Sequence, residues 1–260
     1  MTDIQSVQNP VVKRLKGLRD KKGREESGEM LVEGEKLMLE AVEAGLAPSD
    51  ALIEAEEEAR FAALIQRMES CGALVYAVPR RVLEAVCDTR TPQGACAAFS
   101  LPAPFTAAEA PARLAALDGV QDPGNVGTIW RTADAAGLNG LLLSRACADP
   151  FSPKVQRAAM GSGFRVPASV TDDLPGMLRD LQARGYAIIA SSLRGEPFYE
   201  GCPHGAEKFA LVIGNEARGV SDEVMALADV RLKLPMRGGA ESLNAAVAAG
   251  IMMYELMREQ

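Results

Sequence analysis

Three loops in the second half of the chain combine glycines with side chains that can bind or position a ligand. Their polar members are Asn125 and Arg131 in and after the first loop, Glu216 in the second, and Ser242 and Asn244 in the third. The neighbouring glycines permit tight turns and a close approach of a ligand to the backbone. Together the loops offer amide, hydroxyl, carboxylate and guanidinium groups, and we expect them to converge on one polar site.

Each of these residues also has a purely structural interpretation. Asn125 or Ser242 could cap the amino end of a helix. Arg131 could pair with Asp134 on the same helix at the i, i+3 spacing, and Glu216 could be a solvated loop carboxylate. Single residues of these kinds are more often structural than catalytic. Three polar loops that each follow an expected strand nevertheless favour a shared site.

Histidine and cysteine offer little other chemistry in this chain. The single histidine, His204, lies in a stretch with glycine and proline, residues 201–205, where we expect an exposed loop. A Ser-His-Asp or Cys-His mechanism is therefore excluded unless His204 itself is the base. The cysteines are odd in number, scattered and without a Cys-x-x-Cys pair, which indicates inert thiols rather than disulfides or a metal site. They are Cys71, Cys87, Cys96, Cys147 and Cys202.

The elements that carry the three loops alternate between short apolar strands and helices, which predicts an α/β domain with a parallel sheet and helices on both faces. We expect strands at 114–117, 141–143, 186–190, 209–213 and 230–234, and helices at 129–136, 154–160, 174–183, 222–228 and 243–259. No Gly-x-Gly-x-x-Gly turn follows any of these strands. The nearest glycine pair, in residues 161–163, does not lead into a helix, so the pattern speaks against a dinucleotide-binding site.

The rest of the chain predicts a small separate α/β domain over residues 1–100. A segment rich in proline and alanine, 101–112, suits a linker to the second domain, 113–260. In the first domain we expect strands at 30–32, 51–53, 74–78 and 95–99, and helices at 34–44, 55–70 and 79–86.

The chain is acidic overall, with a formal net charge of −7. Its first domain nevertheless opens with a basic leader of seven residues: Lys13, Arg14, Lys16, Arg19, Lys21, Lys22 and Arg24. The leader could be a solvated helix face or an arm that contacts phosphates, and a local patch suffices for the second role. No apolar run approaches the ~20 residues that span a bilayer, and the first residues do not resemble a secretion signal. We therefore expect a cytoplasmic protein.

The three loops resemble the sequence motifs of the SpoU family, the ribose 2′-O-methyltransferases within the SPOUT superfamily. The matching segments are Asn125-x-Gly127-x-x-x-Arg131, Ile213-Gly214-Asn215-Glu216-x-x-Gly219, and Leu234-Pro235-Met236 followed by Ser242-Leu243-Asn244. Residues less common in the family stand at Trp130, Ala217 and Ala245, none of them a polar motif position. Residues 4–13, 31–34 and 91–94 are similar to the substrate-binding domain of RNA-targeting members, which resembles a ribosomal-protein fold. This similarity favours RNA contact for the basic leader.

The resemblance implies a fold, a cofactor and an oligomeric state. The parallel sheet would contain a deep trefoil knot in its C-terminal segment, and two copies would form a homodimer. The cofactor would be S-adenosylmethionine, without a metal. It would be held largely by backbone groups at Ser191, Ile213, Gly214, Leu234, Pro235, Met236 and Leu243.

The implied reaction is the 2′-O-methylation of a ribose in structured RNA, for which we expect ribosomal RNA ahead of transfer RNA. The residues implied in it are Asn125, Arg131, Glu216, Ser242 and Asn244, with Arg131 supplied by the partner subunit. Guanidinium stays protonated, so Arg131 would hold a phosphate and stabilise alkoxide charge. One alternative is a catalytically silent RNA-binding or ribosome-assembly factor of the same fold. A second is a methyltransferase that acts on a base.

Overall fold

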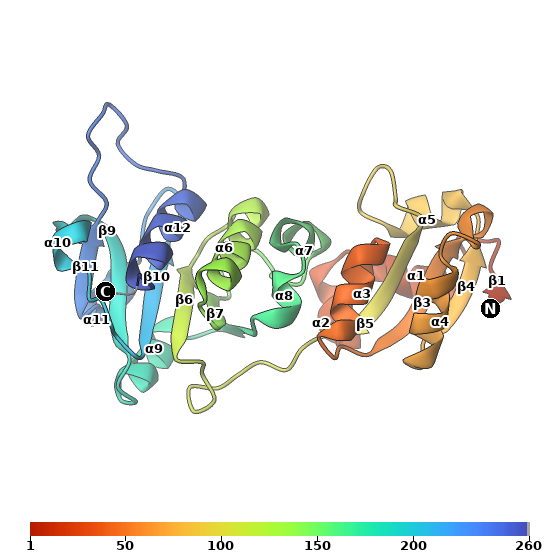
Figure 1. Cartoon of the computed structure of the whole chain (residues 1–260), viewed down its shortest axis with the longest axis horizontal. Helices are drawn as coiled ribbons and strands as arrows, with labels where there is room; N and C mark the ends of the chain where they lie inside the picture. The colour runs from red at the N-terminus through yellow and green to blue at the C-terminus, as the bar shows by residue number, and fades with distance from the viewer. Residues whose placement is uncertain (259–260) are drawn as a thin grey trace. The chain divides into compact units, whose positions relative to one another are not determined.

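The computed structural model describes residues 1–258, which divide into two compact units (Figure 1). Unit 1 comprises Met1–Pro102 together with Phe151–Phe164, and unit 2 comprises Ala103–Pro150 and the chain from Arg165 onward. The change from unit 1 to unit 2 after Pro102 falls inside the segment 101–112 that we expect to be a linker. The segment Phe151–Phe164 differs, because it lies in the sequence of the second domain and packs in unit 1.

Unit 1 is built on one sheet in the order β1-β4-β3-β5-β2. Its strands are β1 (Thr2–Asp3), β2 (Glu29–Glu33), β3 (Pro48–Glu54), β4 (Leu74–Val78) and β5 (Ala95–Ser100). Strand β5 runs antiparallel to both of its neighbours, β2 and β3, whereas β4 is parallel to β3 and to β1. The small domain expected over residues 1–100 therefore has a mixed sheet, in which parallel and antiparallel strand pairs occur together.

Helices cover both faces of this sheet because adjacent strand residues point to opposite sides. Leu31 and Leu52 face the side of α1 (Pro10–Gly17) and α5 (Arg80–Val86). Met30 and Ile53 face the side of α3 (Glu35–Glu43) and α4 (Ala62–Ser70). The remaining helices are α2 (Lys21–Ser27), η1 (Ala55–Glu57), α7 (Pro153–Ala159) and α8 (Ser162–Arg165), the last at the boundary of the two units.

The helix expected over 55–70 is interrupted between η1 and α4. Phe61 lies at the interruption and is fully buried in the core on that face of the sheet. The expected continuous helix is therefore wrong, because the chain turns over residues 58–61 before α4 begins.

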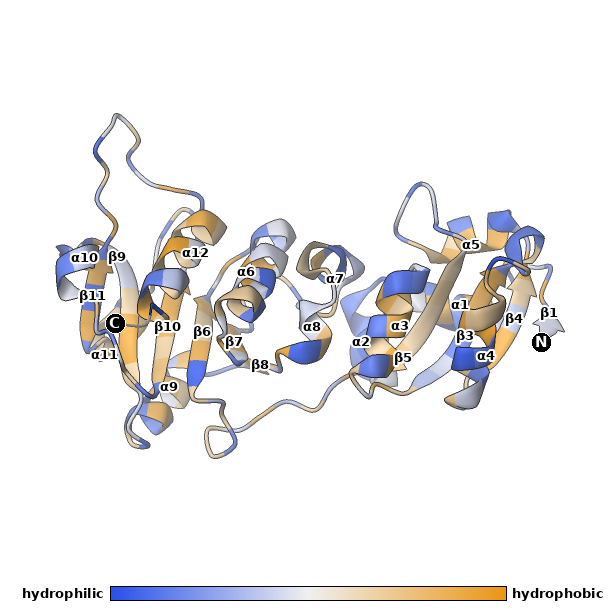
Figure 2. Cartoon of the chain, viewed as in Figure 1, coloured by the Kyte–Doolittle hydropathy of each residue, from blue (hydrophilic) through white to orange (hydrophobic). Residues whose placement is uncertain are grey.

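Unit 2 contains a second sheet, which is parallel throughout and has the order β11-β9-β10-β6-β7-β8. Its strands are β6 (Arg113–Asp118), β7 (Gly140–Ser144), β8 (Ala168–Thr171), β9 (Ala187–Pro197), β10 (Phe209–Gly214) and β11 (Val230–Lys233). Strand β8 was not expected from the sequence, since it is four residues long and carries Ser169 and Thr171 in place of an apolar run. The strands form the apolar centre of the unit (Figure 2).

Two helices on each face bury this sheet. On one face α9 (Leu174–Gln182) and α11 (Asp222–Leu227) pack through Leu178 and Val224 against a core that includes Ile188 and Val212. On the other face α6 (Pro123–Ala136) packs against α12 (Ala245–Leu256), which also contacts β10. A short helix, α10 (Phe198–Gly201), lies beside β9 and β11. The predicted α/β class, a parallel sheet flanked by helices, is confirmed.

The chain between β11 and α12 is a long loop that stands away from the sheet in Figure 1. Residues 237–244 of this loop are exposed. In the described part of the chain, no helix combines the length and apolar character that crossing a bilayer requires.

Candidate active site at the carboxyl ends of the unit 2 strands

The polar loops of unit 2 meet where the strand order reverses. Strands β6 and β10 are neighbours, but the chain leaves β6 towards β7 on one side and leaves β10 towards the opposite side of the sheet. In open parallel sheets such a switch point leaves a crevice at the carboxyl ends of the strands, where ligands bind. The loops that begin at Gly119 and Asn215 both start there.

Three predicted site residues form one hydrogen-bonded chain at this position. The Asn125 Nδ2 donates to Glu216 Oε1 at 2.9 Å. The Asn244 Nδ2 donates to Asn125 Oδ1, also at 2.9 Å. The sequence separations of 91 and 119 residues show that α6, the loop after β10 and the start of α12 are brought together by the fold. The expected convergence of the loops therefore exists for these three residues.

Glu216 is held by backbone groups as well. Its two carboxylate oxygens accept from the backbone N–H groups of Gln121 and Asp122 at 3.3 Å each. Partial burial alone would raise the pKa of Glu216, but the hydrogen bond from Asn125 and those from the backbone outweigh it and lower the pKa below its ordinary value. Glu216 is therefore an oriented carboxylate and not a freely solvated one.

The helix caps lie at other residues than the structural interpretation suggested. Asp122 caps α6 and accepts from the backbone N–H of Asn125 at 2.9 Å, so Asn125 stands inside the helix and is 91% buried. Asn244, not Ser242, caps α12 by accepting from Ala246 and Val247. A capping role for Asn125 or Ser242 is therefore wrong. Asn244 combines two roles, since its Oδ1 caps α12 while its Nδ2 joins the polar chain.

The loop after β10 is stiff. The Asn215 side chain donates to the Gly119 carbonyl at 2.7 Å and accepts from the backbone of Ala217 and Arg218. The backbones of Asn215 and Gly219 exchange two hydrogen bonds of 2.9 Å. A side chain at Gly214 would collide with the backbone of Gly219, so glycine is required there to let the loop close. The sequence motif indicated the loop but not this function of Asn215.

Most of the residues expected to hold S-adenosylmethionine lie within or after three adjacent strands, and Leu243 lies further along the loop before α12. Ser191 belongs to β9, Ile213 and Gly214 end β10, and 234–236 follow β11. Ile213 and Leu234 are buried, whereas Leu243 is 39% exposed. In the part of the chain that the structure describes, the backbone of residues 234–243 forms no hydrogen bond with the backbone of another loop or turn. Free main-chain groups beside apolar side chains suit a purine ring and its edge, so these residues fit the cofactor.

Arg131 and Ser242 lie outside the hydrogen-bonded chain. Arg131 is exposed, and its guanidinium has no partner among residues 1–258. Its expected alternative partner, Asp134, pairs instead with Arg165 at 2.8 Å, so that alternative is wrong. Six residues of helix separate Arg131 from Asn125, a rise of about 9 Å and a rotation of about 120°. Arg131 therefore points away from the Asn125 of its own chain. Ser242 lies in the exposed part of the loop.

The basic leader of unit 1 separates into exposed and internal residues. Five of its residues are exposed: Lys13, Lys16, Arg19, Lys21 and Lys22. Arg14 forms ion pairs with Glu29 and Asp50. Arg24 is 97% buried, and it donates to the carbonyls of Leu18 and Arg19 at 2.6 and 2.8 Å.

Two of the expected phosphate contacts are corrected by this arrangement. A buried guanidinium must be satisfied inside the protein, so Arg24 is a structural residue that closes the turn between α1 and α2. Arg14 is likewise engaged by two carboxylates. Lysine and arginine look alike in a charge run, and only the fold distinguishes the ones that face water.

The expected exposure of His204 is also wrong. Its side chain is 15% exposed and its Nε2 lies 3.5 Å from Glu255 Oε1 on α12. The sequence could not show that the loop after α10 folds against the last helix. The five cysteines carry no disulfide, and burial raises the pKa of the Cys147 and Cys202 thiols, the latter to about 11. Thiols that stay protonated at neutral pH are poor nucleophiles.

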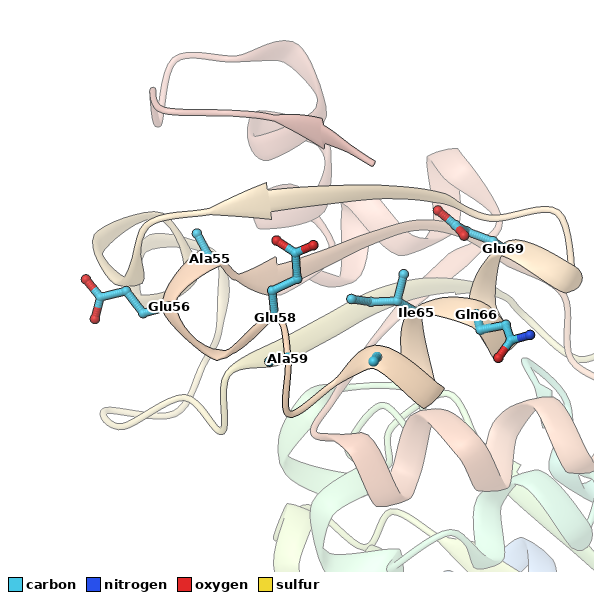
Figure 3. A pocket seen from close by; sticks show the side chains of 8 residues that line it. Ala55, Glu56, Glu58, Ala59, Ile65, Gln66 and Glu69 are labelled. Carbon is cyan, nitrogen blue, oxygen red and sulfur yellow. The ribbon is translucent and has the colours of Figure 1, made fainter.

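Unit 1 has a groove of about 600 Å³ beside α4, on the sheet face opposite to α1 (Figure 3). It is lined by Ala55, Glu56, Glu58, Ala59, Ala62, Ile65, Gln66 and Glu69. Carboxylates repel phosphate, and none of the lining residues belongs to the three polar loops. The groove therefore does not belong to the candidate active site.

Comparisons with known proteins agree with this architecture. Residues 113–254 match the model of the SpoU rRNA Methylase family, and residues 9–97 match the MRM3-like substrate binding domain. The chain is 37% identical over 98% of its length, and 99% of the relative's, to the 23S rRNA (guanosine(2553)-2′-O)-methyltransferase RlmP of Bacillus subtilis. An AdoMet-bound rRNA methyltransferase from Sinorhizobium meliloti has a TM-score of 0.87 and 32% identity, covering 98% of this chain and 97% of that one. The SpoU methyltransferase AviRb of Streptomyces viridochromogenes, in complex with AdoMet, has a TM-score of 0.84 and 27% identity over 96% and 97% of the two chains.

Fold and site together define an RNA methyltransferase that uses S-adenosylmethionine. The chain belongs to the SpoU rRNA methylase family and carries an MRM3-like substrate-binding domain in front of the methylase domain. The predictions of family, enzyme class and cofactor are confirmed.

Proposed function

We propose that this protein transfers a methyl group from S-adenosylmethionine to the 2′-hydroxyl of a ribose in 23S ribosomal RNA. The observation that carries the proposal is the chain Asn244–Asn125–Glu216 at the switch point of the sheet. The full-length similarity to a 23S rRNA guanosine 2′-O-methyltransferase supports the substrate. A ribosomal substrate also supports a place in the cytoplasm.

The cofactor supplies a sulfonium-activated methyl group when bound. The backbone of Ile213 and Gly214 and of 234–236 would hold its adenosine end, with Leu243 packed against it. Ser191, which follows the last β9 residue paired with β10, would contribute a hydroxyl. Asn125, Glu216 and Asn244 would then remain available to bind the acceptor ribose.

A ribose hydroxyl is a weak acid and a poor nucleophile, so the protein must orient it and stabilise the charge that develops on it. Asn125 fixes Glu216 and Asn244 in one geometry, and the Glu216 carboxylate is ionised at neutral pH and can accept from a ribose hydroxyl. Ser242, in the loop before Asn244, would add a hydroxyl once that loop closes on the ligands. Arg131 would hold the phosphate beside the ribose and stabilise the alkoxide, since guanidinium is always protonated.

Arg131 would act from the partner subunit of a homodimer. It faces away from the Asn125 of its own chain, and its guanidinium has no partner among the described residues. The adjacent helix α12 exposes an apolar stripe at i, i+4 and i+7, where Val247, Ile251 and Tyr254 are 52, 37 and 57% exposed. Such a stripe suits an isologous contact, which would place each Arg131 at the site of the other copy.

The C-terminal segment would form the trefoil knot of the SPOUT superfamily. Two observations support this. Strand β11 lies at the edge of the sheet, and α12 does not pack beside it but on α6 and β10, so the chain after β11 has to cross back over β9. The long loop over residues 234–244 supplies the length for that crossing.

The five exposed basic residues of the leader would contact the phosphates of the same RNA, with Lys13 and Lys16 on one face of α1. The MRM3-like substrate binding domain that they belong to supports this assignment.

The experiment is methylation of purified ribosomal and transfer RNA by the purified protein with methyl-labelled S-adenosylmethionine, followed by nucleoside mass spectrometry. The proposal expects 2′-O-methylated nucleoside from 23S RNA. Label on a base would favour the base methyltransferase. Absence of both label transfer and cofactor binding would favour the silent RNA-binding factor.

A further inference from the structure

Arg218 is a charged residue beside the candidate active site to which neither the polar chain nor the cofactor site gives a role. It stands two residues after Glu216, in the loop that follows β10. Residues two apart along a chain lie within about 7 Å of each other at Cα, so the backbone of Arg218 is close to that of Glu216. We propose that Arg218 binds a phosphate of the RNA next to the target nucleotide and thereby positions the ribose.

The backbone of Arg218 is fixed although its side chain is exposed. Its N–H donates to Asn215 Oδ1 at 3.1 Å, and the two hydrogen bonds between Asn215 and Gly219 close the loop around it. A side chain on a stiff loop loses less entropy on binding than one on a mobile segment. The guanidinium therefore projects from a defined point on the rim of the site.

The guanidinium itself is not engaged by the protein. Within residues 1–258 its side chain has no hydrogen bond and no carboxylate within ion-pair distance. Other arginines of unit 2 show the contrast, since Arg145 is taken up by Asp172 and Arg165 by Asp134. An unengaged guanidinium offers a planar set of donors that matches a phosphate in two hydrogen bonds.

The position separates Arg218 from the role proposed for Arg131. A reacting ribose carries a phosphate on each side of its nucleotide, and one guanidinium from the partner subunit accounts for one of them. Arg218 belongs to the chain that carries Asn125 and Glu216, so it would take the other. This inference rests on the proposed function, because it assumes that the acceptor at the site is RNA.

The test compares Arg218→Ala, Arg218→Lys and a control, Arg184→Ala, in the full chain. Arg184 is also exposed, but it precedes β9 and so lies at the amino ends of the strands. Binding of a 23S RNA fragment is measured as a function of salt, binding of S-adenosylmethionine by calorimetry, and methyl transfer by kcat and KM for RNA.

For Arg218→Ala we expect RNA affinity to fall about tenfold. The slope of log K against log salt should become about 0.9 less steep, which corresponds to the loss of one phosphate contact. Cofactor affinity should not change. Arg218→Lys should restore the slope and part of the KM, because it keeps the charge and loses the bidentate geometry. Arg184→Ala should match the wild type in all three measurements.

The proposal is overturned if Arg218→Ala keeps the wild-type slope and KM, if it weakens cofactor binding instead, or if Arg184→Ala gives the same loss. Thermal unfolding of each variant shows whether a loss comes from misfolding, in which case Arg218→Lys decides. Wild-type protein that binds RNA but transfers no methyl group would contradict the proposed function and leave the slope measurement as the test of Arg218.

Discussion

The amide of Asn125 donates to the carboxylate of Glu216 across 2.9 Å and so joins helix α6 to the loop after β10. This bond connects the two elements that leave the sheet in opposite directions at its switch point. The same Asn125 accepts from Asn244 at the start of α12. The buried side chain of Asn125 is thus hydrogen-bonded to residues from the other two polar loops.

The pKa of Glu216 depends on this bond. The folded pKa lies below its ordinary value, so the carboxylate contributes stability above that ordinary value and loses it as pH falls through the folded pKa. Asn125→Ala removes a donor to Glu216, and we expect the Glu216 pKa to rise. Carboxyl chemical shifts followed by NMR over an acid titration measure this change. An unchanged Glu216 titration in Asn125→Ala would show that the bond does not control the charge.

Asn244 allows its two roles to be separated. Asn244→Ala loses both the cap of α12 and the donor to Asn125, so we expect a loss of about 0.5–2 kcal/mol in the free energy of unfolding and a loss of methyl transfer. Asn244→Asp can still cap the helix but cannot donate to Asn125, so it should keep the stability that the cap contributes and yet be inactive. Denaturant unfolding and methyl-transfer assays on both variants check this. Full activity of Asn244→Asp would remove the amide donor from the mechanism.

We expect the burial of each basic residue in the leader, and not its charge, to decide whether it stabilises unit 1 or binds RNA. Arg24→Ala leaves the carbonyls of Leu18 and Arg19 without their donor and empties a buried position, so we expect unit 1 to lose about 1–3 kcal/mol of stability. Lys13→Ala should leave stability within about 0.5 kcal/mol but reduce the salt dependence of RNA binding. Unfolding curves and RNA titrations distinguish the two. Equal effects of the two variants on stability would contradict the assignment.

If Arg131 acts at the site of the partner subunit, two inactive variants should complement each other in a mixed dimer. Arg131→Ala should abolish methyl transfer while sparing cofactor affinity, and Asn125→Ala should be equally inactive. When the two variants are mixed under conditions that exchange subunits, half of the sites in a mixed dimer receive an intact Arg131 and an intact Asn125. Methyl-transfer activity should therefore reappear in the mixture. A mixture as inactive as its components would place Arg131 at the site of its own chain.

The sequence predicted the parts of this protein that repeat locally. The alternation of apolar strands and helices was sufficient for the class of unit 2 and for most strands of both sheets. Strand β8 escaped because four residues with two hydroxyls give no apolar signal. The antiparallel β5 could not be anticipated, since strand direction depends on distant pairing.

The site was predictable as a set of loops but not as a set of contacts. Asn125, Glu216 and Asn244 stood out by type and spacing, yet their hydrogen bonds join residues about a hundred positions apart. Asp122 followed by Pro123 is a local signal for the start of α6, whereas the burial of Arg24 and His204 depends on tertiary packing that no local pattern carries. The segment Phe151–Phe164 joins unit 1 for the same reason, with Arg157 paired to Asp88 at 2.6 Å.

The most direct measurement of the central claim is a map of 2′-O-methyl groups across ribosomal RNA from cells that lack this gene and cells that carry it. The account predicts that one ribose methylation in 23S RNA is lost with the gene, returns with the wild-type protein and does not return with Asn125→Ala. An unchanged methylation map, or full restoration by Asn125→Ala, would contradict it.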